Sequence, residues 1–109
     1  MLILKTRLKN AIVRNADGMD LSFTLKNLSV NGENRGCSGF IRNQANGSVV
    51  YVNTEPTCSP ALALMYRYAN SEHDFTGYHN RWAKNLEDLS TSVVKLLKKT
   101  PAEAKDYRV

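Results

Sequence analysis

The middle of the chain, residues 37–54, carries the pattern of a β-hairpin, and no other segment constrains the fold as much. Two runs of strand-forming residues, Phe40-Ile41 and Val49–Val52, flank a turn centred on Asn46-Gly47. Asn-Gly tolerates the positive φ angles of a tight hairpin turn, and β-branched and aromatic residues suit a pleated surface. Helical sequence follows this hairpin, so the pattern predicts a fold of the α+β class.

Two further segments alternate between apolar and polar residues, as half-buried strands do. The alternation in residues 19–26 is the clearest in the chain. In residues 2–9 it places the basic side chains on one side, and these are Lys5, Arg7 and Lys9. Leu4, Leu8 and Ile12 are also spaced by four, which favours a helix, but the strand is the preferred interpretation. The sequence therefore predicts an antiparallel sheet of about four strands.

Glycines and polar residues indicate where these strands end. Residues 31–36 are polar with two glycines and are expected to form a loop, and Asp17-Gly18 is typical of a turn. Gly39, inside a predicted strand, indicates a bulge or a close approach of another backbone.

Two helices are predicted in the C-terminal half. Ser59-Pro60 is a typical helix start, and the apolar residues after it predict a buried helix over 60–69. A second helix is predicted over 81–99, with Trp82 opening its apolar stripe. Both are expected to cover the apolar face of the sheet. The predicted core is Leu4, Leu8, Leu21, Phe23, Leu25, Val50, Val52, Leu62, Met65, Trp82, Leu86, Leu89 and Val93.

The length of 109 residues and a hydrophobic content of 42% indicate one globular domain. We place that domain at residues 1–99, followed by a flexible tail over 100–109, because Pro101 blocks continuation of the last helix. No apolar run approaches the roughly 20 residues of a membrane-spanning helix, and the first residues lack the organisation of a signal peptide. A cytoplasmic protein with no membrane contact is expected.

The net charge of +5 is concentrated in the first half of the chain, which has seven basic and three acidic residues over 1–54. On a strand, Lys5, Arg7 and Lys9 lie about 7 Å apart, close to phosphate spacing. Arg42 extends this stripe if its strand is a neighbour. The alternative is the ordinary solvated face of a one-sided sheet.

Aromatic and basic residues also interleave at Tyr66–Tyr68 and at Tyr78–Trp82. Arg67, Tyr78 and Arg81 are therefore candidate contacts to bases and phosphates. The alternative is that these aromatic residues belong to the core.

Signals for catalysis are weak. His73, Asp74 and His79 share one loop, but their spacing does not place metal ligands on one face. Cys37 and Cys58 form no zinc or redox spacing, although Cys58 precedes the expected helix start. The sequence predicts no cofactor, no metal site and no catalytic residue.

Several short motifs lie between residues 36 and 82: Gly36–Ile41, Val50–Glu55, Tyr66–Ala69, and Asp74–Gly77 with Asn80. This string resembles small uncharacterised bacterial proteins carried by phages, plasmids or genomic islands. The resemblance implies an accessory protein of a mobile element, a class that often acts by binding host machinery, and it implies no known activity.

The expected function is therefore non-enzymatic binding, by an adaptor or inhibitor that docks on another protein. Docking would use the sheet face or the loop over 70–80, and the partner's surface can be acidic. A nucleic-acid-binding protein that uses the basic residues is the alternative, and a small cysteine- or metal-dependent enzyme is a third. Salt dependence separates the first two, because polyanion binding releases counterions and weakens steeply with salt.

Overall fold

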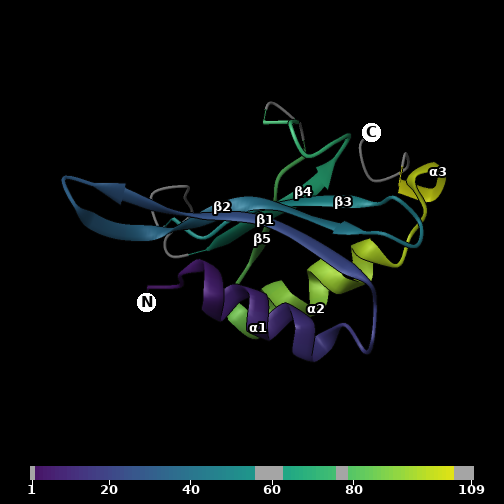
Figure 1. The fold of residues 1–109 in the computed structure, drawn as a ribbon, viewed down its shortest axis with the longest axis horizontal. Helices are drawn as coiled ribbons and strands as arrows, with labels where there is room; N and C mark the ends of the chain where they lie inside the picture. The colour runs from purple at the N-terminus through teal and green to yellow at the C-terminus, as the bar shows by residue number, and fades with distance from the viewer. Residues whose placement is uncertain (1, 56–62, 76–78, 105–109) are drawn as a thin grey trace.

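The chain folds into one five-stranded antiparallel sheet with two helices on one of its faces, as the computed structural model shows for residues 2–55, 63–75 and 79–104 (Figure 1). The predicted α+β class is confirmed. The strands follow one another in space in chain order, β1-β2-β3-β4-β5. The elements are α1 (Lys5–Asn15), β1 (Leu21–Val30), β2 (Glu33–Asn43), β3 (Val49–Asn53), β4 (Leu64–Ala69), β5 (Arg81–Ala83), α2 (Leu86–Leu97) and α3 (Pro101–Ala104).

The predicted strand over residues 2–9 is wrong, because this segment begins helix α1. Leu8, Ala11 and Ile12 are all buried, and their spacing of three and four places them on one side of a helix. The alternation of apolar and polar residues over 2–9 is too short to distinguish a strand from a helix. The competing spacing of Leu4, Leu8 and Ile12 was the informative pattern, since it continues beyond residue 9.

The predicted helix over 60–69 is also wrong where it can be compared: Leu64–Ala69 is strand β4, and residues 56–62 lie outside the described part of the chain. β4 pairs with β3 on one side and with β5 on the other. Leu64 and Tyr68 pack with the core under the helices, whereas Ala69 packs on the opposite face. A strand buried on both faces lacks the alternation that identifies a strand in sequence.

Helix α2 begins at Leu86 and not at residue 81. The side chain of Asn85 accepts a hydrogen bond from the amide of Asp88 at 2.8 Å and caps the helix. Trp82 lies instead in β5, paired with Met65, and is 39% exposed. Its predicted place in the core is therefore wrong.

Both hairpin turns depend on residues with positive φ. The amide of Gly47 donates to the Asn43 carbonyl at 2.8 Å, which confirms the predicted β2–β3 hairpin. The loop predicted over 31–36 shrinks to a two-residue turn at Asn31-Gly32, with φ angles of 53° and 79°. β1 and β2 therefore continue to this turn as a long hairpin that projects from the body (Figure 1).

Helices α1 and α2 cover one face of the sheet, called here the helix face; the opposite side is the second face (Figure 1). A buried hydroxyl fixes the chain that leads into α1. Thr54 Oγ1 accepts a hydrogen bond from the Cys37 amide at 2.9 Å and donates to the Ile3 carbonyl at 2.8 Å. The core under the helices includes Ile3, Leu8, Ile12, Ile41, Val50, Val52, Leu89, Val93 and Leu97.

The predicted close approach at Gly39 is confirmed. A Cβ atom there would lie 1.9 Å from the carbonyl oxygen of Thr24 and 2.8 Å from Cα of Leu25, and its φ of 149° suits glycine alone. Backbone from β1 therefore occupies the space that a side chain would need.

We expect Gly39→Ala to separate β1 from β2 and to lower the free energy of unfolding by about 3 kcal/mol or more, because backbone must move. Gly32→Ala is the matched control: its φ is 79°, but nothing lies within 4 Å. It should cost about 1 kcal/mol. Urea denaturation measures both, and equal costs would contradict a close approach at Gly39.

Candidate functional site

Strand β1 forms one edge of the sheet, and its backbone groups alternate between β2 and the outside. In β2, the Asn43 amide donates to the Ser48 carbonyl, and the Cys37 carbonyl accepts from the Thr54 amide, both at 2.9 Å. Asn43 and Cys37 therefore direct their backbone groups away from β1. Their partners in the register, Leu21 and Asn27, are at non-hydrogen-bonded positions of the β1–β2 ladder.

Since these positions alternate, four residues direct their N–H and C=O groups to the outside: Leu21, Phe23, Leu25 and Asn27. Within the described part of the chain, none of these outward groups has a hydrogen-bond partner. β1 is ten residues long, contains no proline and has Lys26 as its one charged residue. Natural edge strands are usually shorter or carry more of these protections, so this edge is a template for pairing with another strand.

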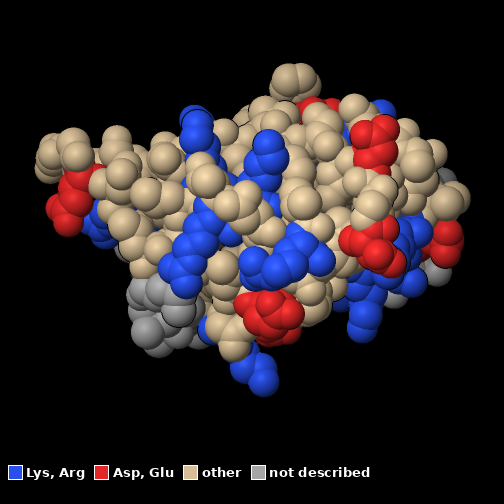
Figure 2. All heavy atoms as spheres, turned by 60° about the horizontal axis from the view of Figure 1, so that its bottom comes forward, with Lys and Arg blue, Asp and Glu red and all other residues tan. Residues whose placement is uncertain are grey.

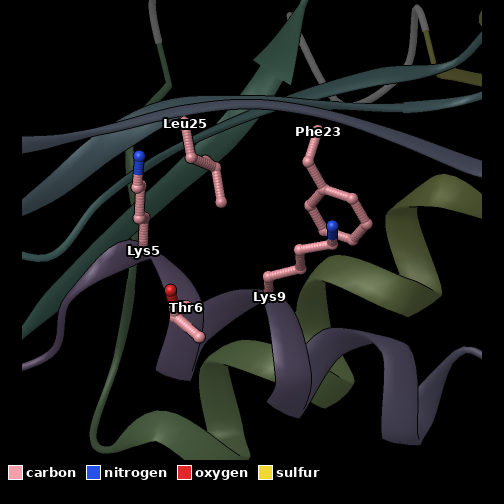
Figure 3. A pocket seen from close by; sticks show the side chains of 5 residues that line it. All are labelled: Lys5, Thr6, Lys9, Phe23 and Leu25. Atoms are coloured by element: carbon pink, nitrogen blue, oxygen red, sulfur yellow. The ribbon is translucent and has the colours of Figure 1, made fainter.

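A pocket of about 240 Å³ lies beside this edge, between β1 and the first two turns of α1. Its lining residues are Lys5, Thr6 and Lys9 from α1 and Phe23 and Leu25 from β1. Figure 3 shows the two lysines rising from α1 toward the strand while Phe23 and Leu25 descend from it. Lys9 Nζ lies 5.4 Å from the centre of the Phe23 ring, a cation–π contact. We call this the Lys5–Lys9 pocket.

The charge around this pocket is uniformly basic on α1. The helix carries Lys5, Arg7, Lys9 and Arg14 and no acidic residue. Lys and Arg side chains gather in the middle of this side of the molecule, where acidic atoms also lie beside them, and further acidic side chains lie toward its two ends (Figure 2).

The first turns of α1 and α2 differ in their acidic residues. Glu87 and Asp88 stand in the first turn of α2, where the helix dipole favours negative charge. The first turn of α1 has none, and a neutral amide caps it: Asn27 Oδ1 accepts from the Lys5 amide at 2.9 Å. The positive end of α1 is therefore not compensated by a charge of its own.

The second face is covered in part by the segment that follows β4. Phe75 packs its ring against Phe40 and Tyr51, with centroids 5.0 and 6.2 Å apart, and is itself 63% exposed. Arg67 is 2% exposed and lies over the same Tyr51 ring, at 4.6 Å from its centre. Arg67 pairs with the Asp74 carboxylate at 3.6 Å and donates to the Asp74 carbonyl at 2.6 Å. Burial lowers the pKa of this guanidinium, and the Asp74 carboxylate acts in the opposite direction.

A second pocket of about 240 Å³ lies on this face, between the β1–β2 hairpin and the segment after β4. Phe40 and Phe75 line it, together with Thr24, Lys26 and Glu72. Glu72 accepts a hydrogen bond from Thr24 Oγ1 and pairs with Arg42, both at 3.4 Å. The second face of the edge therefore carries the Lys26 ammonium and the Arg42–Glu72 ion pair, whereas the lining of the Lys5–Lys9 pocket on the helix face has basic residues and no acidic one.

The seven candidate binding residues do not form one surface. Lys5 and Lys9 share the pocket beside β1, but Arg7 does not line it and donates to the Leu2 carbonyl at 3.3 Å. The predicted row of three basic residues on a strand is therefore wrong, because on a helix a spacing of four, not two, brings side chains together.

The other candidates are distributed over both faces. Arg42 lies on the second face in its ion pair with Glu72, and Arg67 is buried, so neither presents an unpaired charge to a phosphate. Arg81 lies in β5, paired in register with Tyr66 on the helix face. Tyr78 lies outside the described residues.

The residues considered for catalysis have no supporting geometry in the described part. Among residues 2–55, 63–75 and 79–104, no three His, Cys, Asp or Glu side chains group as metal ligands would. Cys37 is buried, and burial raises the pKa of its thiol, although the Thr54 hydroxyl acts in the opposite direction. A raised pKa makes a thiol a poorer nucleophile at neutral pH. Cys58 lies outside the described residues.

Comparison with known proteins adds no family: no family model, no curated protein and no solved structure matches this chain. None of the helices in the described ranges has the length and apolar character of a membrane span.

The sequence-based predictions missed the unpaired edge and the pocket beside it. Phe23 and Leu25 do pack against the core, as predicted, but they also line this pocket, and Thr6 lies on helix α1 and not on the predicted strand. The spacing of four between Lys5 and Lys9 was visible, and a helical interpretation of residues 2–9 would have placed both lysines together.

The two ion pairs of the second face should differ in their contribution to stability. Asp74→Ala leaves the buried Arg67 charge unpaired, and we expect it to lower the free energy of unfolding by about 3 kcal/mol. Glu72→Ala removes the partly exposed pair, whose side chains are 40% and 31% exposed, and should cost less than about 1 kcal/mol. Urea denaturation of both variants tests this difference, which equal losses would contradict.

Proposed function

We propose that this protein is a non-enzymatic protein-binding module that takes up an extended segment of a partner as an additional antiparallel strand along β1. The observation that carries the proposal is the set of outward N–H and C=O groups of Leu21, Phe23, Leu25 and Asn27, which have no partner in the described structure. In strand addition such main-chain groups supply affinity, and adjacent pockets select side chains.

An adaptor or an inhibitor fits this mode of binding, because either needs a docking surface and no chemistry of its own. We place this role in the cytoplasm and among the accessory proteins of mobile elements. The motifs between residues 36 and 82 support that class, since they resemble such proteins. The weak nucleophilicity expected of the buried Cys37 thiol agrees with a role without catalysis.

Nucleic-acid binding has less support from the geometry. A polyanion site needs several basic side chains along one track. Arg42 and Arg67 are committed to Glu72 and Asp74 on the second face, on the opposite side of the sheet from Lys5 and Lys9.

Amide hydrogen exchange tests the state of the edge in the protein alone. We expect the amides of Leu21, Phe23 and Leu25 to exchange faster than those of Ser22 and Thr24, because only the latter bond to β2. NMR resolves each amide. Uniform protection along β1 would mean that the edge is already paired, and the proposal would then fail.

Binding is tested with linear decapeptides selected from a random displayed library. A selected peptide should slow exchange at the same outward amides by at least about tenfold. Protection confined to other surfaces, or a library that yields no binder while single-stranded DNA binds at physiological salt, would contradict the proposal.

A further inference from the structure

We propose that the Lys5–Lys9 pocket is the specificity pocket of the β1 edge and that it binds the carboxylate of a Glu or Asp side chain in the partner strand. This inference rests on the proposed function and names the chemistry of the partner, an acidic extended peptide.

The register of an added strand places its side chains at this pocket. In an antiparallel ladder, two residues that exchange both N–H···O=C bonds lie directly opposite and point to the same face. Phe23 and Leu25 direct their backbone groups outward and their side chains to the helix face, where both line the pocket. A partner residue bonded to either of them therefore presents its side chain to Lys5 and Lys9 (Figure 3).

The lining of the pocket suits a Glu or Asp side chain, which has a carboxylate at the end of one or two methylene groups. Phe23 and Leu25 provide apolar surface for methylene groups, while Lys5, Lys9 and Thr6 provide ammonium and hydroxyl donors. Charge-assisted hydrogen bonds of this kind are among the stronger polar contacts. No acidic residue on α1 competes for the two lysines.

The first turn of α1 gives an independent reason for an anionic occupant. Basic side chains near a helix N-terminus are unfavourable with the helix dipole, and the first turn of α1 contains Lys5 and Arg7, whereas the first turn of α2 contains Glu87 and Asp88. A carboxylate from a partner would compensate this end of the helix.

The opposite face of the same edge favours apolar side chains. Side chains of a strand alternate between faces, so the residues next to the acidic ones point toward the second face, where Glu72 lies beside Thr24. Lys26 and the Arg42–Glu72 ion pair also lie there, so neither sign of charge dominates, and the rings of Phe40 and Phe75 favour apolar residues. The expected partner segment therefore alternates acidic and apolar residues.

A second copy of this chain does not fit these requirements. Antiparallel pairing of two β1 edges would bring the α1 helices to the same side of the joined sheet, with Lys5 and Lys9 of each copy approaching those of the other. Like charges across such an interface disfavour it.

The test uses fluorescent decapeptides that alternate Val with Glu, or Val with Gln, in fluorescence anisotropy at physiological salt. We expect the Glu peptide to bind about tenfold more tightly than the Gln peptide, as two ion pairs of ordinary strength would give. The double variant Lys5→Met with Lys9→Met should remove this preference, so that the Glu and Gln peptides bind it with equal affinity.

The matched control is Arg14→Met with Lys95→Met, which removes the same charge from exposed positions that do not line the pocket. It should keep the preference for Glu. Equal binding of the Glu and Gln peptides, or an equal loss of preference in the control variant, would overturn the pocket assignment. A single-stranded decathymidine that binds more tightly than the Glu peptide and depends on Lys5 and Lys9 would reassign the pocket to nucleic acid.

Backbone methylation separates this inference from the proposed function. N-methylation of the Glu residues removes the N–H groups that face β1 and should abolish binding, whereas N-methylation of the Val residues should be tolerated. If methylation of the Glu residues has no effect, or if neither the Glu peptide nor the Gln peptide binds, strand addition itself is wrong. If methylation abolishes binding but Glu and Gln bind equally, strand addition stands and the pocket assignment fails.

Discussion

The buried hydroxyl of Thr54 joins three segments on which the rest of the structure depends. Thr54 directly follows β3. Its hydroxyl accepts a hydrogen bond from the Cys37 amide of β2 and donates one to the Ile3 carbonyl just before α1. A buried hydroxyl without these partners would be costly, so the geometry is closely determined. The beginning of α1 is thereby tied to the centre of the sheet, and Asn27 ties the Lys5 amide to β1. These bonds hold the basic end of the helix beside the unpaired edge.

The two sides of the sheet use charge differently. On the second face, the Arg67 guanidinium is buried over the Tyr51 ring and paired with Asp74, and it helps to hold the segment after β4 on the sheet. On the helix face, Lys5 and Lys9 remain at the surface beside a pocket, and no acid of α1 pairs with them. Charge of the first kind supports the fold. Charge of the second kind is available to a partner, which is why the edge and the pocket together carry the functional proposal.

The local patterns that predicted the fold correctly were those in which neighbouring residues decide the structure. The Asn46-Gly47 turn, the alternation of residues 19–26 and the steric demand for Gly39 each follow from backbone geometry over a few positions. The segments at 2–9 and 64–69 failed because tertiary packing decides them. Leu8 and Ile12 become a helix stripe only when α2 and the sheet are there to bury it, and Leu64–Ala69 lacks the alternation of a half-buried strand because both of its faces are covered. Tertiary structure also decides the candidate site. The sequence indicates Lys5 and Lys9 as binding residues, but only the order of the strands in the sheet shows that they lie beside an unpaired edge.

The central claim is that a partner segment pairs with β1, and an isotope-filtered NOE spectrum of the labelled protein with a bound decapeptide tests it most directly. The account predicts cross-peaks from the peptide backbone to backbone protons of Leu21, Phe23, Leu25 and Asn27, with the spacing of an antiparallel ladder. Cross-peaks from the peptide to Phe75 and Trp82 on the second face, with none to β1, would contradict it.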